Sequence, residues 1–220
     1  MSRLFETPSE KPSENLTARE VAGDPATPAP EFSLVQRRAL LRIAHEAVLS
    51  LLERRPFPEP LPLPPGLSDP RGVFTTLYLR GDQHGDRQLR GCVGYAVPIA
   101  PLYRAVAETA RAAAFEDSRF SPVTREEALK LEVSLSVLSR LFPIRPELVE
   151  VGRHGLVISL GARRGLLLPQ VPVEHGWERE IFLEQTCRKA GLPLDAWRKT
   201  ATVEAFTAEV FADSDAEIPL

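Results

Sequence analysis

The stretch Leu131-Glu132-Val133-Ser134-Leu135-Ser136-Val137-Leu138 decides the class of fold. Apolar side chains alternate with polar ones along it. Successive residues of a β-strand point to opposite faces, so this pattern predicts a strand with one buried face and one exposed face. The buried face requires other elements packed against it, and helical patterns occur on both sides of this stretch.

Two capping boxes mark the starts of helices in the first half of the chain. Ser33 with Gln36, and Thr124 with Glu127, have the spacing in which the side chain of each residue can bond the backbone of the other. The first pair opens an apolar stripe at helical spacing, and the second opens a short helix that leads into the strand at 131–138. Pro101 suits the first turn of a further helix.

The expected elements follow the same order in both halves of the chain. In each half two strands come first, then two helical segments, then a third strand. In the first half the strands are expected at 73–79, 89–95 and 131–138, with a turn at 81–86. In the second half they are expected at 156–160, 166–168 and 203–210. The helical segments of the second half are a helix at 178–190, closed by Gly191, and a short helical turn around Ala196. We therefore expect an α+β fold, a single domain of two β-β-α-α-β halves that share a curved, barrel-like sheet with helices packed outside it.

Composition sets the domain limits and narrows the classes of function. Residues 1–31 are rich in Pro, Ser, Thr, Glu and Ala, which predicts a disordered tail before one domain at 32–220. The net charge of −3 gives no global attraction to nucleic acid or to anionic membranes. No apolar run is long enough for a membrane span, and the first residues lack the apolar run of a signal peptide. We expect a cytoplasmic protein that does not enter membranes.

The segment Leu89-Arg90-Gly91-Cys92-Val93-Gly94 is the first candidate site, and it is interpreted as a turn after a strand. Glycines let other groups approach the backbone closely, so Gly91 and Gly94 are candidate binding positions together with Arg90. Arg90 and a following helix N-terminus would favour the nucleophilic thiolate of Cys92, the candidate catalytic residue. The alternative is that Cys92 is a small core residue, as Cys187 is expected to be within its helix.

Two further features are candidates for the same site. Asp117 and Arg119 either line a binding site or cap a helix and fix the loop that follows it. His154, in a predicted turn, is the candidate base near Cys92, the alternative being a plain loop residue. The histidine and cysteine spacings match no metal motif, so neither a metal nor a cofactor is predicted.

Several separate motifs resemble the AMMECR-type domain family, also called AmmeMemoRadiSam system protein A. The similarity covers about residues 32–211, and one departure is Val93, where the family more often has isoleucine. The matching segments are Leu89 to Gly94, Pro101-Leu102, Ala113-Ala114-Phe115, Asp117, Arg119 to Pro122, Glu132 to Leu138, Gly155-Leu156, Gly165 to Pro172, Gly176-Trp177 and Lys189 to Leu192.

The resemblance implies a duplicated α+β domain, and it implies partners without supplying a reaction. The family name reflects an association with Memo-type and radical S-adenosylmethionine proteins, which suggests a shared modification pathway. Two classes of function stay open: an enzyme or carrier that works through Cys92, and a non-catalytic regulatory module that binds protein or RNA. Small basic spots at 37–38 and 163–164 would serve the second class, but the aromatic residues of an RNA platform are missing beside them.

Overall fold

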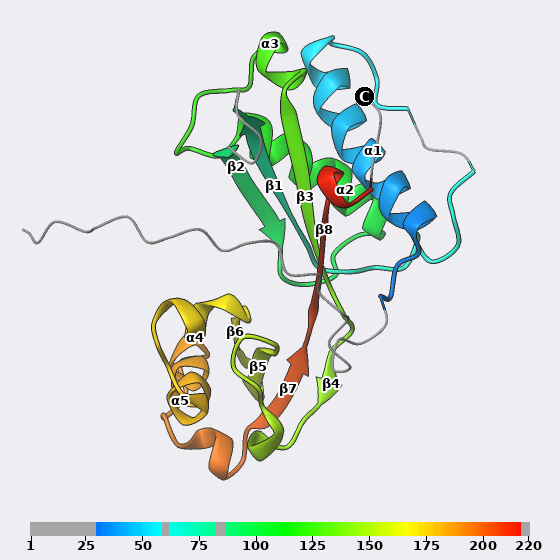
Figure 1. The fold of residues 1–220 in the computed structure, drawn as a ribbon. Coiled ribbons are helices and arrows are strands. Elements are labelled where there is room, and N and C mark those ends of the chain that lie inside the picture. Colours follow the sequence, from blue (N-terminus) through cyan, green and yellow to red (C-terminus); the bar gives the residue numbers. More distant parts are fainter. Residues whose placement is uncertain (1–29, 59–61, 82–86, 217–220) are drawn as a thin grey trace, which may run out of the picture. The chain divides into compact units, whose positions relative to one another are not determined.

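The computed structural model describes residues 30–58, 62–81 and 87–216 (Figure 1). In chain order the elements are α1 (Leu34–Leu52), β1 (Val73–Arg80), β2 (Arg87–Tyr95), α2 (Leu102–Phe115), α3 (Arg125–Ala128), β3 (Leu131–Leu138), β4 (Phe142–Pro143), the 3₁₀ turn η1 (Pro146–Leu148), β5 (Gly155–Leu160), β6 (Arg163–Leu167), α4 (Gln170–Glu174), α5 (Arg179–Lys189), η2 (Ala196–Arg198), β7 (Thr202–Phe206), β8 (Ala208–Ala212) and α6 (Asp213–Ala216). The predicted tail and turn fall almost wholly on residues 1–29 and 82–86, outside these ranges, so the tail and the domain limit at residue 32 stay predictions. Within the described ranges, no helix combines the length and the apolar character needed to cross a membrane.

The local signals that predicted the helix ends are confirmed. Ser33 accepts a hydrogen bond from the Gln36 N–H, and the Gln36 side chain accepts one from the Ser33 N–H. Thr124 and Glu127 do the same at the start of α3. Gly191 follows α5 with a φ of 68°, a left-handed conformation that favours glycine.

The strands form two antiparallel sheets, with the orders β2-β1-β3-β8 and β4-β7-β5-β6. Each half of the chain builds three strands of its own sheet and sends its last stretch into the other sheet. β4 directly follows β3 but pairs with β7, while β8 directly follows β7 but pairs with β3. The α+β class and the repeated β-β-α-α-β order are therefore confirmed, and the exchanged last strands link the halves.

The expectation of one shared, barrel-like sheet is wrong, as is that of an unbroken last strand at 203–210. The described strands form two separate sheets, because the ladder between the stretches 131–143 and 202–212 is interrupted between β3 and β4 and between β7 and β8, and no further pairing closes a barrel. At the interruption the Ser139 N–H donates to the Thr207 carbonyl at 2.8 Å, and the Ser139 hydroxyl accepts from the Thr207 N–H at 3.0 Å. The side-chain bond replaces the second backbone bond of a regular pair, so each stretch splits into two strands.

The duplication extends to individual packing contacts. A side chain at Gly91 in β2 would collide with the Ala113 carbonyl in the last turn of α2, with only 2.0 Å between the added Cβ and the oxygen. At Gly165 in β6 the added Cβ would lie 2.4 Å from the Ala190 nitrogen at the end of α5. Both helices carry Thr-x-Arg-x-Ala at this point, in 109–113 and 186–190. In each half, a glycine lets the second strand lie directly against a helix backbone.

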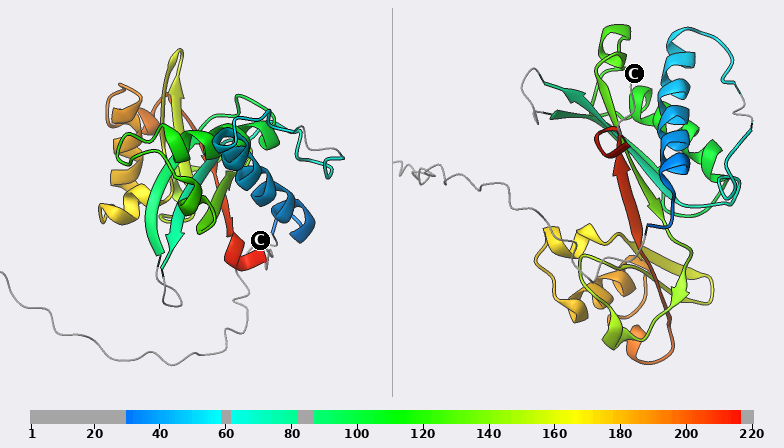
Figure 2. Two further views of the ribbon diagram at one scale, coloured as in Figure 1. Left: turned by 90° about the horizontal axis from the view of Figure 1, so that it is seen from above. Right: turned by 45° about the vertical axis from the view of Figure 1, so that its right-hand side comes forward.

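The first sheet has one covered face and one open face. α1 and α2 lie on the same side of it (Figure 2), and the alternate β3 residues that face them, such as Val133 and Leu135, are almost fully buried. The opposite side is called the open face below. Several of its side chains are only partly buried, among them Thr76, Cys92, Ser134 and Ser136, and Val210 is 62% exposed.

Candidate functional site

Cys92 lies inside strand β2, which confirms the strand expected at 89–95 and corrects the interpretation of Leu89–Gly94 as a turn. β2 forms an edge of the first sheet, and Cys92 pairs with Thr76 on β1. The pairing register slips so that Gly91 lies opposite Leu77 and Leu89 opposite Tyr78, which leaves Arg90 as the extra residue of a β-bulge. The bulge puts Arg90 on the helix side of the sheet and Cys92 on the open face.

The sulfur of Cys92 has a hydroxyl neighbour on the adjacent strand. The Thr76 hydroxyl donates a hydrogen bond to Cys92 Sγ at 3.3 Å. Cys92 is partly exposed and unpaired, whereas Cys187 is fully buried. Burial raises the pKa of the Cys187 thiol, so the neutral and less reactive form is favoured there. This confirms the prediction that Cys187 belongs to the core.

Asp117 holds the backbone of β2 at Cys92. Because β2 is an edge strand, outward-facing N–H groups have no strand partner, and the Cys92 N–H donates to Asp117 Oδ2 at 2.9 Å. Arg119 donates to the same carboxylate from Nε at 2.9 Å and from Nη2 at 2.7 Å. The Arg119 side chain, followed by the Cys92 N–H, holds the pKa of Asp117 well below its usual value. Asp117 is therefore a fixed carboxylate that positions Cys92 and does not transfer protons.

Arg90 points away from the thiol, towards α3. Its side chain is 10% exposed and forks onto Glu127, with Nε to Oε1 at 3.0 Å and Nη2 to Oε2 at 3.1 Å, and Nη2 also reaches the Pro122 carbonyl. The Arg90 side chain is the main cause that lowers the pKa of Glu127. Both arguments offered from sequence for a favoured thiolate fail on geometry. Arg90 is committed to Glu127, and the helix end that touches β2 at Gly91 is the C-terminal end of α2, which carries the negative pole.

The two glycines are explained by packing within the protein. Gly91 leaves room for the backbone of α2, as described above. A side chain at Gly94 would collide with the ring of Phe74, whose Cδ1 lies 2.3 Å from the added Cβ. The structure thus brings Cys92, Asp117 and Arg119 together. It places Arg90 and Gly91 against helices, and it uses Gly94 to seat an aromatic ring on the open face.

His154 lies directly before β5 of the second sheet. Its Nδ1 accepts the Glu150 N–H at 3.0 Å, and its ring packs edge-on against Phe142. Burial lowers its pKa, so the neutral ring that these contacts require is favoured. The contacts account for His154 as a structural residue, and its assignment as a catalytic base draws no support from them. In the described part of the chain, no three His, Cys, Asp or Glu side chains gather to hold a metal ion.

Thr76 is the residue of this site that sequence reasoning missed. Nothing in its own segment marks it, because Thr75 and Thr76 are both ordinary strand residues. Only the hairpin register brings its hydroxyl to Cys92, and the bulge at Arg90 shifts that register by one residue. A search for threonines on the strand before Leu89–Gly94 would have found Thr76 as one of two candidates.

The comparisons with known proteins agree with these motifs. The AMMECR1 family model matches residues 41–211. The chain belongs to the AMMECR1 family. A family relative in Thermococcus gammatolerans is 46% identical over 182 residues, which are 79% of this chain and 88% of that one. Another, in Methanopyrus kandleri, is 40% identical and covers 86% of this chain and 94% of its own. The crystal structure of the uncharacterised protein PH0010 from Pyrococcus horikoshii matches with a TM-score of 0.61 at 41% identity, over 82% of this chain and 92% of that one.

Within the AMMECR1 family fold, the arrangement at Cys92 supports the chemistry of a positioned thiol. The backbone is fixed by a carboxylate that is itself held by an arginine, and the sulfur receives a hydroxyl bond. The Thr76 hydroxyl and the Asp117 carboxylate therefore hold the side chain and the backbone of Cys92 in one position on the open face. The family is one of uncharacterised function, so its fold does not by itself choose between catalysis and binding.

Proposed function

We propose that this AMMECR1-family protein works through the Cys92 thiol, as an enzyme or carrier whose substrate approaches the open face. The observation that carries the proposal is the hydroxyl-to-sulfur bond from Thr76 to Cys92, made at a partly exposed sulfur whose backbone Asp117 fixes. A nucleophilic cysteine needs access to its substrate and a held position. Both are present at Cys92, and Cys187 has no access.

The alternative function, a non-catalytic module that binds protein or RNA, draws less support. Its basic spots are partly used within the protein, since Arg37 pairs with Glu209 at 2.9 Å and Arg163 donates to the Gly191 carbonyl at 3.0 Å. A binding module would also tolerate a fully buried thiol, whereas Cys92 is partly exposed.

The finer part of the proposal concerns pathway and location. We place the protein in the cytoplasm, in a modification pathway with Memo-type and radical S-adenosylmethionine proteins; this rests on the family resemblance and on two unpaired cysteines, which suit a reducing compartment. The purified protein should co-elute with the Memo-type or the radical protein of the same organism in size-exclusion chromatography. Separate elution of all three, with unchanged alkylation of Cys92 in the mixture, would count against this pathway.

Alkylation by iodoacetamide at pH 7, followed by mass spectrometry, tests the thiol itself. Native Cys92 should react and Cys187 should stay unmodified until the protein unfolds. Thr76→Val removes the hydroxyl and keeps the shape, so it should slow the reaction of Cys92 about fivefold, or about 1 kcal/mol for a partly exposed bond. Ser134→Ala, on the next strand of the open face, is the matched control and should leave the rate unchanged. Equal rates for Thr76→Val and the native protein, or a Cys92 as inert as Cys187, would refute the proposal.

A further inference from the structure

A pocket of about 310 Å³ lies where the two sheets meet. Its apolar lining comes from both sheets: Leu138 from β3, Leu166 from β6 and Phe206 from β7. These side chains belong to a small cluster that lies apart from the main core of each half. The volume falls at the lower end of the range for small-molecule sites, so the pocket suits a compact ligand with an apolar body.

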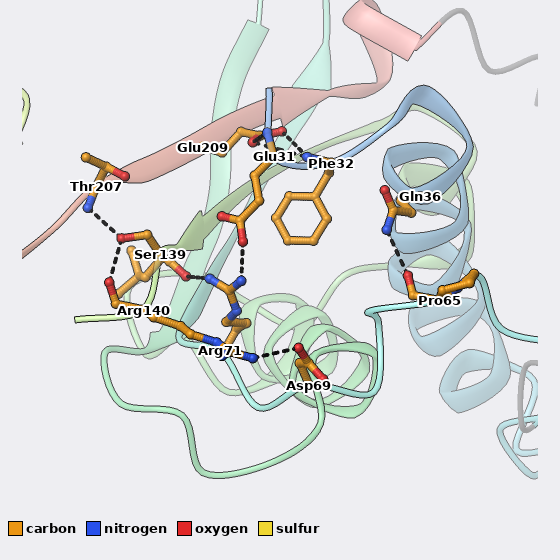
Figure 3. Close-up of polar contacts among 11 residues, drawn as sticks. Glu31, Phe32, Gln36, Pro65, Asp69, Arg71, Ser139, Arg140, Thr207 and Glu209 are labelled. Atoms are coloured by element: carbon orange, nitrogen blue, oxygen red, sulfur yellow. Dashed lines mark hydrogen bonds and ion pairs between the residues drawn. The ribbon is translucent and has the colours of Figure 1, made fainter. Parts of the chain in front are cut away.

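Three arginines line the same pocket, and none of its described lining residues is acidic. Arg71 and Arg140 are partly used: Arg71 bonds Glu31 and the Leu138 carbonyl, and Arg140 pairs with Asp69 at 2.9 Å (Figure 3). Arg71 Nε has no hydrogen-bond partner among the described residues, but it is fully buried, so a ligand in the pocket does not reach it. The positive charges of Arg71 and Arg140 still favour an anion in the pocket.

Arg164 is the cation that remains available. It lines the pocket together with Leu166, two residues further along β6, and its side chain is exposed. Its side chain has no ion pair or hydrogen bond with any other residue of the described ranges. The neighbouring Arg163 differs, because it donates to the Gly191 carbonyl. A guanidinium beside an apolar wall recognises an anionic head group attached to an apolar body.

We propose that this pocket binds a small organic anion, a carboxylate or a phosphate ester with an apolar body, whose head group meets Arg164. A neutral apolar molecule would gain nothing from the guanidinium of Arg164, and a purely polar anion would leave the lining of Leu138, Leu166 and Phe206 uncovered. One molecule that carries both parts uses both features of the pocket.

The pocket lies on the same side of the first sheet as the Cys92 thiol. Leu138 is four residues along β3 from Ser134, which is in register with Thr76 and through it with Cys92. At about 3.3 Å per residue, the separation along the sheet is about 13 Å. Phe74, seated over Gly94, lies in the row between them. A ligand anchored in the pocket can therefore extend towards the thiol, although its binding requires nothing of Cys92.

Titration with 8-anilinonaphthalene-1-sulfonate, an aromatic body with one sulfonate, tests the pocket by fluorescence. The native protein should show saturable binding to one site. Arg164→Gln should weaken it about tenfold, which corresponds to about 1.4 kcal/mol. Arg163→Gln makes the same change of charge on the same strand and should stay within about twofold of native. Binding of the uncharged N-phenyl-1-naphthylamine should be equal in all three proteins.

Displacement experiments then identify the head group. Octanoate or octyl phosphate should displace the probe from the native protein, and the stronger competitor shows which acid the pocket prefers. Displacement by neither, an unchanged affinity in Arg164→Gln, or an equal loss in Arg163→Gln would overturn the proposal. Cys92→Ser should bind the probe normally, so failure of the thiol proposal and failure of this one are told apart.

Discussion

Replacing Gly91 by alanine puts a methyl group against the backbone of α2. The new Cβ would lie 2.0 Å from the Ala113 carbonyl oxygen, and ordinary van der Waals contact begins at 3.4 Å, so strand and helix must separate by about 1.4 Å. A backbone carbonyl in a helix cannot rotate away, which places the cost at the upper end for overpacking, about 3 kcal/mol. For a domain of this size, that lowers the melting temperature by about 6–12 °C.

Thermal unfolding followed by circular dichroism measures this effect. Gly165→Ala, the equivalent change in the second half, should also lower the melting temperature, because its Cβ would lie 2.4 Å from the Ala190 nitrogen. Gln88→Ala changes an exposed residue of the same strand as Gly91 and should stay within about 2 °C of native. A Gly91→Ala protein that melts within 2 °C of native would refute the close approach of β2 to α2.

Three further predictions concern the residues around the thiol. Cys92→Ser should keep the melting temperature within about 2 °C of native, because the side chain is partly exposed; a larger fall would show that the sulfur is core. Arg90 lowers the pKa of Glu127, so the pair stabilises the fold above the ordinary glutamate pKa of about 4.3, and this contribution is lost as the pH falls through the lowered pKa. The free energy of unfolding of Glu127→Gln, measured in urea, should therefore depend less on pH below 5 than that of the native protein. The same pH dependence in both proteins would contradict the pairing. Asp117→Ala should speed hydrogen exchange of the Cys92 amide, measured by mass spectrometry of the peptide that contains it, and unchanged exchange would show that the hydrogen bond is absent in solution.

Local signals were sufficient for most elements of the fold. The capping boxes at Ser33 and Thr124 and the alternation in 131–138 act over a few residues, so sequence alone carries them. The short helix α4 and the two-residue strand β4 were not predicted, because neither is long enough to show a period. The exchange of β4 and β8 between the sheets was also missed, since strand pairing depends on contacts between residues far apart in the chain.

The same division applies to the candidate site. By itself the sequence determined the family, the α+β class, the repeated order of elements and the segment Leu89–Gly94 as a point of interest, because each follows from residue types at fixed spacing. Only the tertiary structure decided what that segment does. A one-residue bulge at Arg90 chose which side chains face the helices and which face outward. The bulge turned Arg90 towards Glu127 and brought the Thr76 hydroxyl to the sulfur of Cys92. Strand residues one position apart point to opposite faces, so a shift of one residue changes which side chains meet. Neither composition nor residue spacing reveals such a shift.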